Sequence, residues 1–207
     1  IIITVIIAII LIVGIVLGVS AHTWKTLAQE MMNNQNSIVI DTDGNTIAKL
    51  GSERKQIPIS YEEIPDNLPN AYVAIEDERF YSHHGVDIKR TGSAILSYVF
   101  HFGSSSYGGS TITQQLVKNL TGDNTDSVFR KVKEWWKAYL LELYFSKEEI
   151  LEIYLNVIYV GPNIYGVQTG SKYYFNENAT DLSLAESAFL AGINNSPNSY
   201  NPFSDSH

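Results

Sequence analysis

Three short segments of the sequence carry residues whose types and spacing could do chemistry. The first, residues 76–85, places three carboxylates, an arginine and two histidines within ten positions and opens with Glu76 and Asp77. Such a density of charge is as typical of an exposed, salt-bridged helix end as of an active site. Adjacent side chains point in different directions on a helix, so His83 and His84 do not predict a zinc site.

The second segment, residues 108–119, passes from two glycines into a predicted helix that Ser110 or Thr111 would cap. Backbone amides at a helix start, hydroxyl groups, paired glutamines and Lys118 together suit a diphosphate and sugar hydroxyls. An ordinary capped loop with a solvated lysine explains this segment alone equally well.

The third segment contains Arg130, Lys131 and Glu134. Arg130 and Glu134 are four residues apart, so they share a helix face, and a structural salt bridge is the default interpretation. Together with Lys118, however, the two cations form a local basic group in a chain whose formal net charge is -8. Such a group is expected where an anionic headgroup is held.

The elements that position these residues begin with a stretch that has no charged side chain, residues 1–21. About 20 apolar residues match the thickness of a bilayer, so we expect one N-terminal transmembrane helix there, with a signal sequence as the alternative. Residues 22–60 are predicted as a juxtamembrane spacer with a short β-hairpin turning at Asp43-Gly44. Residues 61–207 form the remaining domain. The first residue is not methionine and the last segment lacks a closing element, so the sequence is interpreted as a fragment, truncated at its C-terminus.

This domain is predicted to be mainly α-helical. Helices are expected from about Pro69 to Phe80, from Phe129 to Tyr144, from Ser146 to Leu155, and from Ser183 to near Asn194, the last two with capping boxes. Phe102 to Ser110 is rich in glycine and serine and predicts a loop. Trp135, Trp136 and Tyr139 follow helical spacing, which favours core or membrane-facing contacts over sugar platforms.

Composition narrows the function classes. The chain has no cysteine, which excludes a disulfide framework and a thiolate metal site. Its acidic balance argues against a nucleic-acid partner.

In this order and spacing, the segments resemble the peptidoglycan glycosyltransferase domain (family 51) of class A penicillin-binding proteins and monofunctional transglycosylases. The resemblance covers about Ile38 to Phe203. The matching positions are Glu76-Asp77 with Phe80, His83 and Gly85; Gly109 to Gln115; Arg130-Lys131 with Glu134; and Ile150-Leu151-Glu152 with Tyr154-Leu155-Asn156, followed by Gly166 to Phe175, Leu184 to Glu186 and Asn201-Pro202.

The resemblance implies a lysozyme-like, two-lobed glycosyltransferase domain that polymerises lipid II. The lipid-linked glycan chain is the donor, a second lipid II is the acceptor, the anomeric configuration inverts, and undecaprenyl diphosphate is released. It also implies a single-pass protein of the bacterial cytoplasmic membrane with its catalytic domain on the outer face. Cell-wall synthesis proteins are expected partners, and a fused transpeptidase domain is left open.

By the same resemblance, Glu76 is the general base, and Glu134 lies across the cleft to serve the leaving-group side or to orient cations. A divalent cation, magnesium or manganese, is expected, with Asp77 and Glu134 as candidate ligands, and no organic cofactor. Phe80, His83 and Glu152 are expected to support the structure. The predicted substrate-binding residues are Asp77, Ser110, Thr111, Gln114, Gln115, Lys118, Asn119, Arg130 and Lys131.

Two other functions compete with this prediction. Two carboxylates across a cleft also suit a lysozyme-like enzyme that cleaves glycan. Cleavage of a neutral glycan has no diphosphate to bind, so Lys118, Arg130 and Lys131 favour synthesis. A non-catalytic, membrane-tethered scaffold is the third interpretation, and the presence of every motif carboxylate disfavours it.

Overall fold

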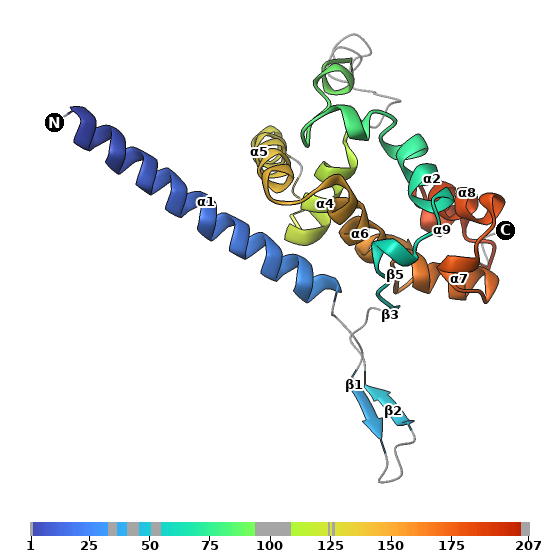
Figure 1. Cartoon of the computed structure of the whole chain (residues 1–207). Helices are drawn as coiled ribbons and strands as arrows, with labels where there is room; N and C mark the ends of the chain where they lie inside the picture. The colour runs from blue at the N-terminus through green and yellow to red at the C-terminus, as the bar shows by residue number, and fades with distance from the viewer. Residues whose placement is uncertain are drawn as a thin grey trace.

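The computed structural model of the chain describes residues 2–32, 37–40, 46–50, 55–93, 109–123, 125 and 127–203. Most of these residues are helical, which confirms the mainly α prediction (Figure 1). In chain order the elements are α1 (Ile2–Met32), β1 (Ser37–Ile40), β2 (Thr46–Leu50), β3 (Lys55–Gln56), η1 (Tyr61–Glu63), α2 (Asn67–Glu76), η2 (Phe80–Ser82), α4 (Ile112–Thr121), α5 (Val128–Tyr144), α6 (Lys147–Val157), β4 (Tyr159–Gly161), β5 (Ile164–Tyr165), α7 (Val167–Phe175), η3 (Ala179–Asp181), α8 (Leu184–Ile193) and α9 (Pro197–Tyr200).

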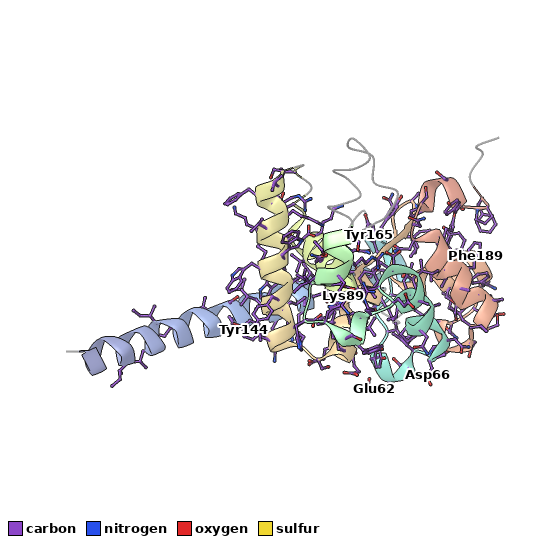
Figure 2. All side chains as sticks on the ribbon, turned by 90° about the horizontal axis from the view of Figure 1, so that it is seen from above. Glu62, Asp66, Lys89, Tyr144, Tyr165 and Phe189 are labelled. Carbon is purple, nitrogen blue, oxygen red and sulfur yellow. The ribbon has the colours of Figure 1, made fainter. Side chains whose placement is uncertain are left out.

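Helix α1 is one continuous helix that runs past residue 21 and projects from the rest of the chain (Figures 1 and 2). Near its end it contacts α4, α5 and α6, where Trp24 and Ala28 are buried in the core. Within the described part of the chain, no helix reaches both the length and the apolarity of a membrane span. The transmembrane helix over residues 1–21 therefore stays a prediction.

The predicted hairpin is confirmed at its two strands, because β1 and β2 pair antiparallel. Its expected turn at Asp43-Gly44 lies outside the described residues. Most of the predicted loop, Phe102 to Ser110, also lies outside them, and only its last two positions are described.

Helix α6 forms the centre of the fold, between α4 and α5 on one side and α7 and α8 on the other (Figure 1). Its N-terminus follows from a local signal, since Ser146 and Glu149 form the predicted capping box. Seven of its eleven residues are buried, among them Leu151 and Tyr154 with no exposed surface, so the helix is covered on nearly every side. Packing of α4 against α5 and α6 places the site on this core.

Helix α2 ends at Glu76, four residues before the predicted end at Phe80. The reason is local: Asp77 has a φ of -157° and a ψ of 68°, which lie outside the helical region, and the next helical turn is the separate η2. At its other end Pro69 lies in the first turn, as predicted. The Tyr72 hydroxyl donates to the carbonyl of Leu190 at 3.0 Å and ties α2 to α8. Glu76 is thus presented from a fixed helix end.

A three-stranded sheet in the order β3-β5-β4 was not predicted, because two of its strands are only two residues long. Side chains of α6 hold the segment that follows β3. Asn156 bonds both the N–H and the carbonyl of Ile59, and the Glu152 carboxylate accepts from the N–H of Tyr61 at 2.9 Å. Glu152 therefore supports the chain that leads into α2 and lies outside the site described below.

Candidate active site

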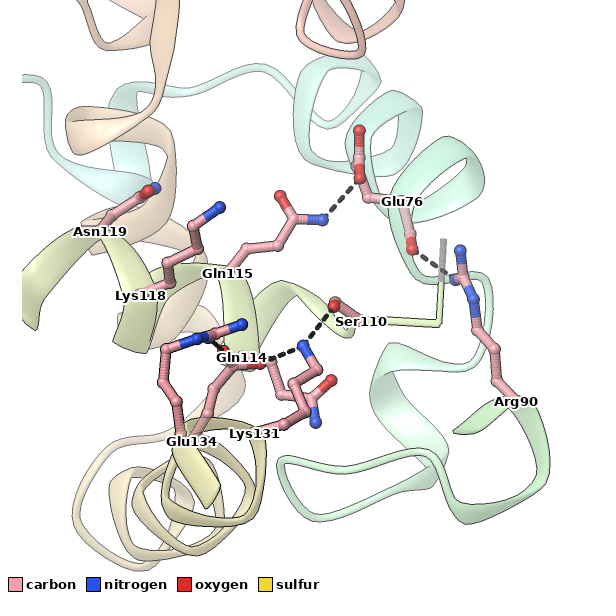
Figure 3. A pocket seen from close by; sticks show the side chains of 10 residues that line it. Glu76, Arg90, Ser110, Gln114, Gln115, Lys118, Asn119, Lys131 and Glu134 are labelled. Carbon is pink, nitrogen blue, oxygen red and sulfur yellow. Dashed lines mark hydrogen bonds and ion pairs between the residues drawn. The ribbon is translucent and has the colours of Figure 1, made fainter. Parts of the chain in front are cut away.

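A pocket of about 450 Å³ lies between the end of α2 and the facing sides of α4 and α5 (Figure 3). Four cationic side chains and two carboxylates line it, so its described wall carries an excess of positive charge. Such a wall attracts an anionic ligand. The lining residues are Glu76, Arg90, Ser110, Gln114, Gln115, Lys118, Asn119, Arg130, Lys131 and Glu134.

Helix α4 supplies four of these side chains because its turns place residues 114, 115, 118 and 119 on one face. Gln115 and Lys118 point from this face toward Glu76 (Figure 3). The Nε2 of Gln114 is buried and has no hydrogen-bond partner within the described part of the chain. A buried N–H donor is normally paired, so this group can be satisfied by an oxygen atom of a bound ligand. The exposed ammonium of Lys118 also has no partner among described residues and is available to an anion.

Both carboxylate oxygens of Glu76 accept hydrogen bonds from neutral amides. Gln115 Nε2 donates to Oε2 at 2.6 Å, and Asn194 Nδ2 donates to Oε1 at 3.1 Å. The guanidinium of Arg90 donates to the backbone carbonyl of Glu76 (Figure 3). A cation at the C-terminal end of a helix is favoured by the helix dipole, so Arg90 stabilises the end of α2.

Glu134 orients two of the cations. Its carboxylate is only 5% exposed, and its oxygens lie 2.5 Å from Arg130 and 2.5 Å from Lys131. The ammonium of Lys131 also donates to the Ser110 hydroxyl at 2.8 Å, which links α5 to the start of α4. Arg130 and Lys131 are therefore held in place before any ligand binds.

Two predicted substrate-binding residues, Asp77 and Thr111, are not among the residues that line the pocket. Asp77 is completely buried and accepts from the N–H of Ile112, the first residue of α4, at 3.0 Å. Its two oxygens lie 3.0 and 3.1 Å from His83 Nε2, and since a carboxylate can only accept, this nitrogen carries the proton. Asp77 thus ties the end of α2 to the start of α4 beneath the pocket.

Thr111 is the N-cap of α4, one of the two caps predicted. Its hydroxyl accepts from the N–H of Gln114 at 3.1 Å and donates to the carbonyl of Gly85 at 2.6 Å. Gly85 has a φ of +79°, and a Cβ there would lie 2.5 Å from the backbone of Ala138 in α5. Only glycine fits this close approach, so the α4 cap depends on Gly85.

Phe80 and His83 lie under the same helix end. The ring of Phe80 is buried, with the Lys147 ammonium 4.2 Å from its centroid and the His83 ring 6.2 Å away, edge to face. Lys147 also donates to the carbonyl of His83 at 2.8 Å, which connects this turn to α6. Both residues contact the fold rather than the pocket.

The donor set does not fit a divalent cation held by the protein alone. Within the described residues, no group of three or more histidines or carboxylates is arranged to hold a metal. Of the predicted ligands, Glu134 has both oxygens paired with cations, and Asp77 is fully buried. Magnesium or manganese therefore stays a prediction without support from these side chains.

A second pocket of about 300 Å³ adjoins the first and shares Glu76, Gln115 and Asn119 with it. Its other described lining residues are uncharged: Ile158, Tyr159, Asn194, Asn195 and Pro197. Glu76 therefore stands between a cationic pocket and one lined by amides and a tyrosine. Amide side chains and aromatic rings suit neutral sugar units.

Sequence reasoning missed several residues around Glu76. Tyr154 belongs to a motif segment, and its buried hydroxyl bonds both Gln115 and Asn194. Arg90 and Asn194 lie outside the three chemical segments, and no local pattern marks them. Their roles arise because the chain returns to Glu76 after 14 and 118 residues, respectively.

The chain is similar to one known protein family and to several penicillin-binding proteins. Residues 43–207 match the family model described as transglycosylase. Penicillin-binding protein 1A of Clostridium botulinum is 45% identical over 179 residues, which are 85% of this chain and 22% of that protein. Penicillin-binding protein 1F of Bacillus subtilis is 41% identical over 174 residues, 84% of this chain and 24% of that protein. Penicillin-binding protein 1A of Clostridium perfringens is 45% identical over 177 residues, which are 84% of this chain and 26% of that protein. The chain thus spans about a quarter of the length of these relatives.

Proposed function

The chain belongs to the transglycosylase family, and we propose that it is a peptidoglycan glycosyltransferase that polymerises lipid II into glycan strands. One observation carries this proposal: Glu76 lines a single pocket together with four cationic side chains. A carboxylate that can take a proton and a cationic wall that can hold a diphosphate are the two groups such a transfer requires.

In the proposed reaction, Glu76 removes the proton from the 4-hydroxyl of the acceptor sugar. That oxygen forms the new bond to the anomeric carbon of the donor glycan as the bond from this carbon to the diphosphate breaks. The configuration inverts, and undecaprenyl diphosphate leaves with the negative charge. The second pocket, beside Glu76, would hold the uncharged sugar units.

Lys118, Arg130 and Lys131 would neutralise the charge that grows on the leaving diphosphate. Electrostatic stabilisation of this kind is usually the largest single contribution to catalysis. Glu134 is proposed to orient Arg130 and Lys131, since both its oxygens are already paired with them. The Nε2 of Gln114, which has no partner among the described residues, would bind sugar or phosphate oxygens together with Ser110, Gln115 and Asn119.

Glycan hydrolysis is the weaker candidate. Lysozyme-like cleavage needs two carboxylates that can act on a neutral linkage. Here the second carboxylate, Glu134, is engaged by two cations, and the pocket wall is positive. Both features favour a substrate that carries a diphosphate.

The test is an incubation of the detergent-solubilised protein with purified lipid II, comparing wild type with Glu76→Gln. Wild type should make polymer, and Glu76→Gln should make little while remaining folded and still binding lipid II. Asp66→Asn, at an exposed site on the other end of α2, is the matched control and should polymerise normally. Shortened glycan from wild type would identify a hydrolase, and equal polymer from both proteins would remove Glu76 from the mechanism.

We also propose that the protein works at the outer face of the cytoplasmic membrane. Exposed apolar residues recur along one face of α5, a stripe made of Val128, Phe129, Val132, Trp136, Tyr139 and Leu143. Exposed aliphatic and aromatic groups beside lysines are typical of helices that lie against a lipid surface. Described side chains of α1 such as Leu11 and Ile15 are also exposed and apolar, which supports an anchoring role for this helix.

The membrane proposal can be tested cleanly because the chain contains no cysteine. Trp136→Cys and Leu184→Cys would each be labelled with a polarity-sensitive fluorophore, the second at an exposed apolar position on α8 away from α5 (Figure 1). Phosphatidylglycerol vesicles should shift the emission of the α5 label and leave the α8 label unchanged. Equal responses at both sites would contradict a lipid-facing α5.

The remaining parts of the proposal concern the whole protein. We propose that the domain has a lysozyme-like, two-lobed layout and that cell-wall synthesis proteins are its partners, which membership of the transglycosylase family supports. We further propose that the full-length protein carries a transpeptidase domain, which the names of its penicillin-binding relatives support. Penicillin binding by the full-length protein would test the last of these.

A further inference from the structure

Glu76 and three other side chains form a closed ring of hydrogen bonds. Gln115 and Asn194 each donate to one oxygen of the Glu76 carboxylate. The hydroxyl of Tyr154 lies behind them, 3.0 Å from Gln115 Oε1 and 3.3 Å from Asn194 Nδ2. The four groups come from α2, α4, α6 and the C-cap of α8, so the ring joins four separate helices around the Glu76 carboxylate.

The donor and acceptor roles around this ring are mutually consistent. Asn194 Nδ2 can only donate, so the oxygen of Tyr154 accepts from it and the Tyr154 proton is left for Gln115 Oε1. This orientation of the Gln115 amide turns its Nε2 toward Glu76. Burial, with a smaller contribution from the Glu76 charge, raises the pKa of Tyr154 well above its ordinary value, so its hydroxyl keeps the proton it donates.

The ring opposes a specific competing contact. Glu76 is the last residue of α2, it is only partly buried, and it shares a pocket with four cationic side chains. An unrestrained glutamate has three side-chain torsions, and nearby cations would draw its carboxylate into an ion pair. Such an ion pair would engage the proposed general base and also a cation that would otherwise bind the diphosphate.

We propose that Asn194 is a positioning residue that, with Tyr154 and Gln115, holds Glu76 between the two pockets and away from the cations. This inference rests on the proposed glycosyltransferase function and adds to it. The amide donors are neutral, so they orient the carboxylate without removing its charge. Asn194 is itself placed by α8, which the Tyr72 hydroxyl ties to α2 at the carbonyl of Leu190.

The test compares kcat and KM for lipid II in the full chain for wild type, Asn194→Ala and Asn194→Asp. A hydrogen bond to a charged group is worth roughly a ten- to hundred-fold effect, so Asn194→Ala should lower kcat about ten-fold with KM within about two-fold. Asn194→Asp keeps the shape but replaces the donor with a second carboxylate, so its kcat should fall further, about a hundred-fold. Tyr154→Phe removes only the hydroxyl and should lower kcat roughly two- to ten-fold.

The order of the two Asn194 variants separates positioning from shape. If Asn194 only filled space, the isosteric Asn194→Asp would be the milder change, and that order would overturn the inference. Full kcat in Tyr154→Phe would also overturn it. Asn70→Ala, at an exposed asparagine on α2, is the matched control and should keep wild-type activity. Failure of wild type itself to make polymer would instead overturn the proposed function on which the inference rests.

Discussion

Replacement of Asp77 by asparagine should destabilise the protein strongly, although the two side chains have nearly the same volume. Asp77 is completely buried, and its carboxylate faces two donors, the N–H of Ile112 and Nε2–H of His83. An asparagine offers one oxygen and one NH₂ group. If that oxygen takes the place of Oδ2, which accepts from both donors, the NH₂ group takes the place of Oδ1 and lies against the Nε2–H of His83. Both remaining hydrogen bonds also lose their charged acceptor.

The size of this effect follows from the burial and from the charge. A hydrogen bond to an ionised group contributes about 1.5–3 kcal/mol net. The substitution weakens the two such bonds that Asp77 accepts, one from Ile112 and one from His83. We therefore expect Asp77→Asn to lose about 3–4 kcal/mol in free energy of unfolding. A chain of this size shifts by roughly 2–4 °C per kcal/mol, so Tm should fall by about 6–16 °C.

Thermal unfolding followed by circular dichroism measures this change directly. Asp66→Asn is the matched control, since Asp66 is an exposed residue at the N-cap of α2 with no side-chain cap bond, and asparagine caps equally well (Figure 2). Its Tm should stay close to that of wild type. If Asp77→Asn melts with wild type but binds lipid II poorly, Asp77 is a substrate contact and the structural reasoning is refuted.

Three further predictions concern packing, pH and charge. Gly85→Ala should lower the free energy of unfolding by about 3 kcal/mol, because its φ is +79° and its Cβ would meet the backbone of α5. Gly122 has a φ of +63° but open space around it, so Gly122→Ala should lower the free energy of unfolding by only about 1 kcal/mol. Equal losses for the two variants in denaturant titration would contradict this reasoning. Burial, with a smaller effect of a neighbouring tyrosine, raises the pKa of Tyr174 to about 12, so the unfolded chain loses this proton first. The contribution of Tyr174 to stability should be complete below pH 10 and be lost as pH rises toward 12; melts of wild type and Tyr174→Phe across this range check it, and parallel pH curves would refute it. Lys118→Ala should raise KM for lipid II roughly ten-fold, which corresponds to about 1.4 kcal/mol. Lys172→Ala, at an exposed lysine on α7, should leave this KM unchanged. A similar rise of KM in both variants would show that the effect is not local to the pocket.

Much of the fold could be predicted because its signals are local. The capping boxes Ser146 with Glu149 and Ser183 with Glu186 each join residues three apart, and both helices begin where these pairs stand. The early end of α2 was missed because nothing near Phe80 in the sequence shows that Asp77 leaves the helix. Asp77 turns away because its carboxylate bonds α4, which is 35 residues further along the chain.

The candidate site divides in the same way. The sequence, through its motif resemblance, predicted the residues of the site, and nine of the eleven predicted catalytic and binding residues line one pocket. The tertiary structure places the other two, Asp77 and Thr111, outside the pocket, where their side chains accept hydrogen bonds from the first turn of α4. It also decided that Asn194 reaches Glu76 across 118 residues of sequence. Hydrogen bonds between residues three or four apart follow from the helix repeat alone, whereas contacts between distant helix ends exist only once packing has fixed those ends in space.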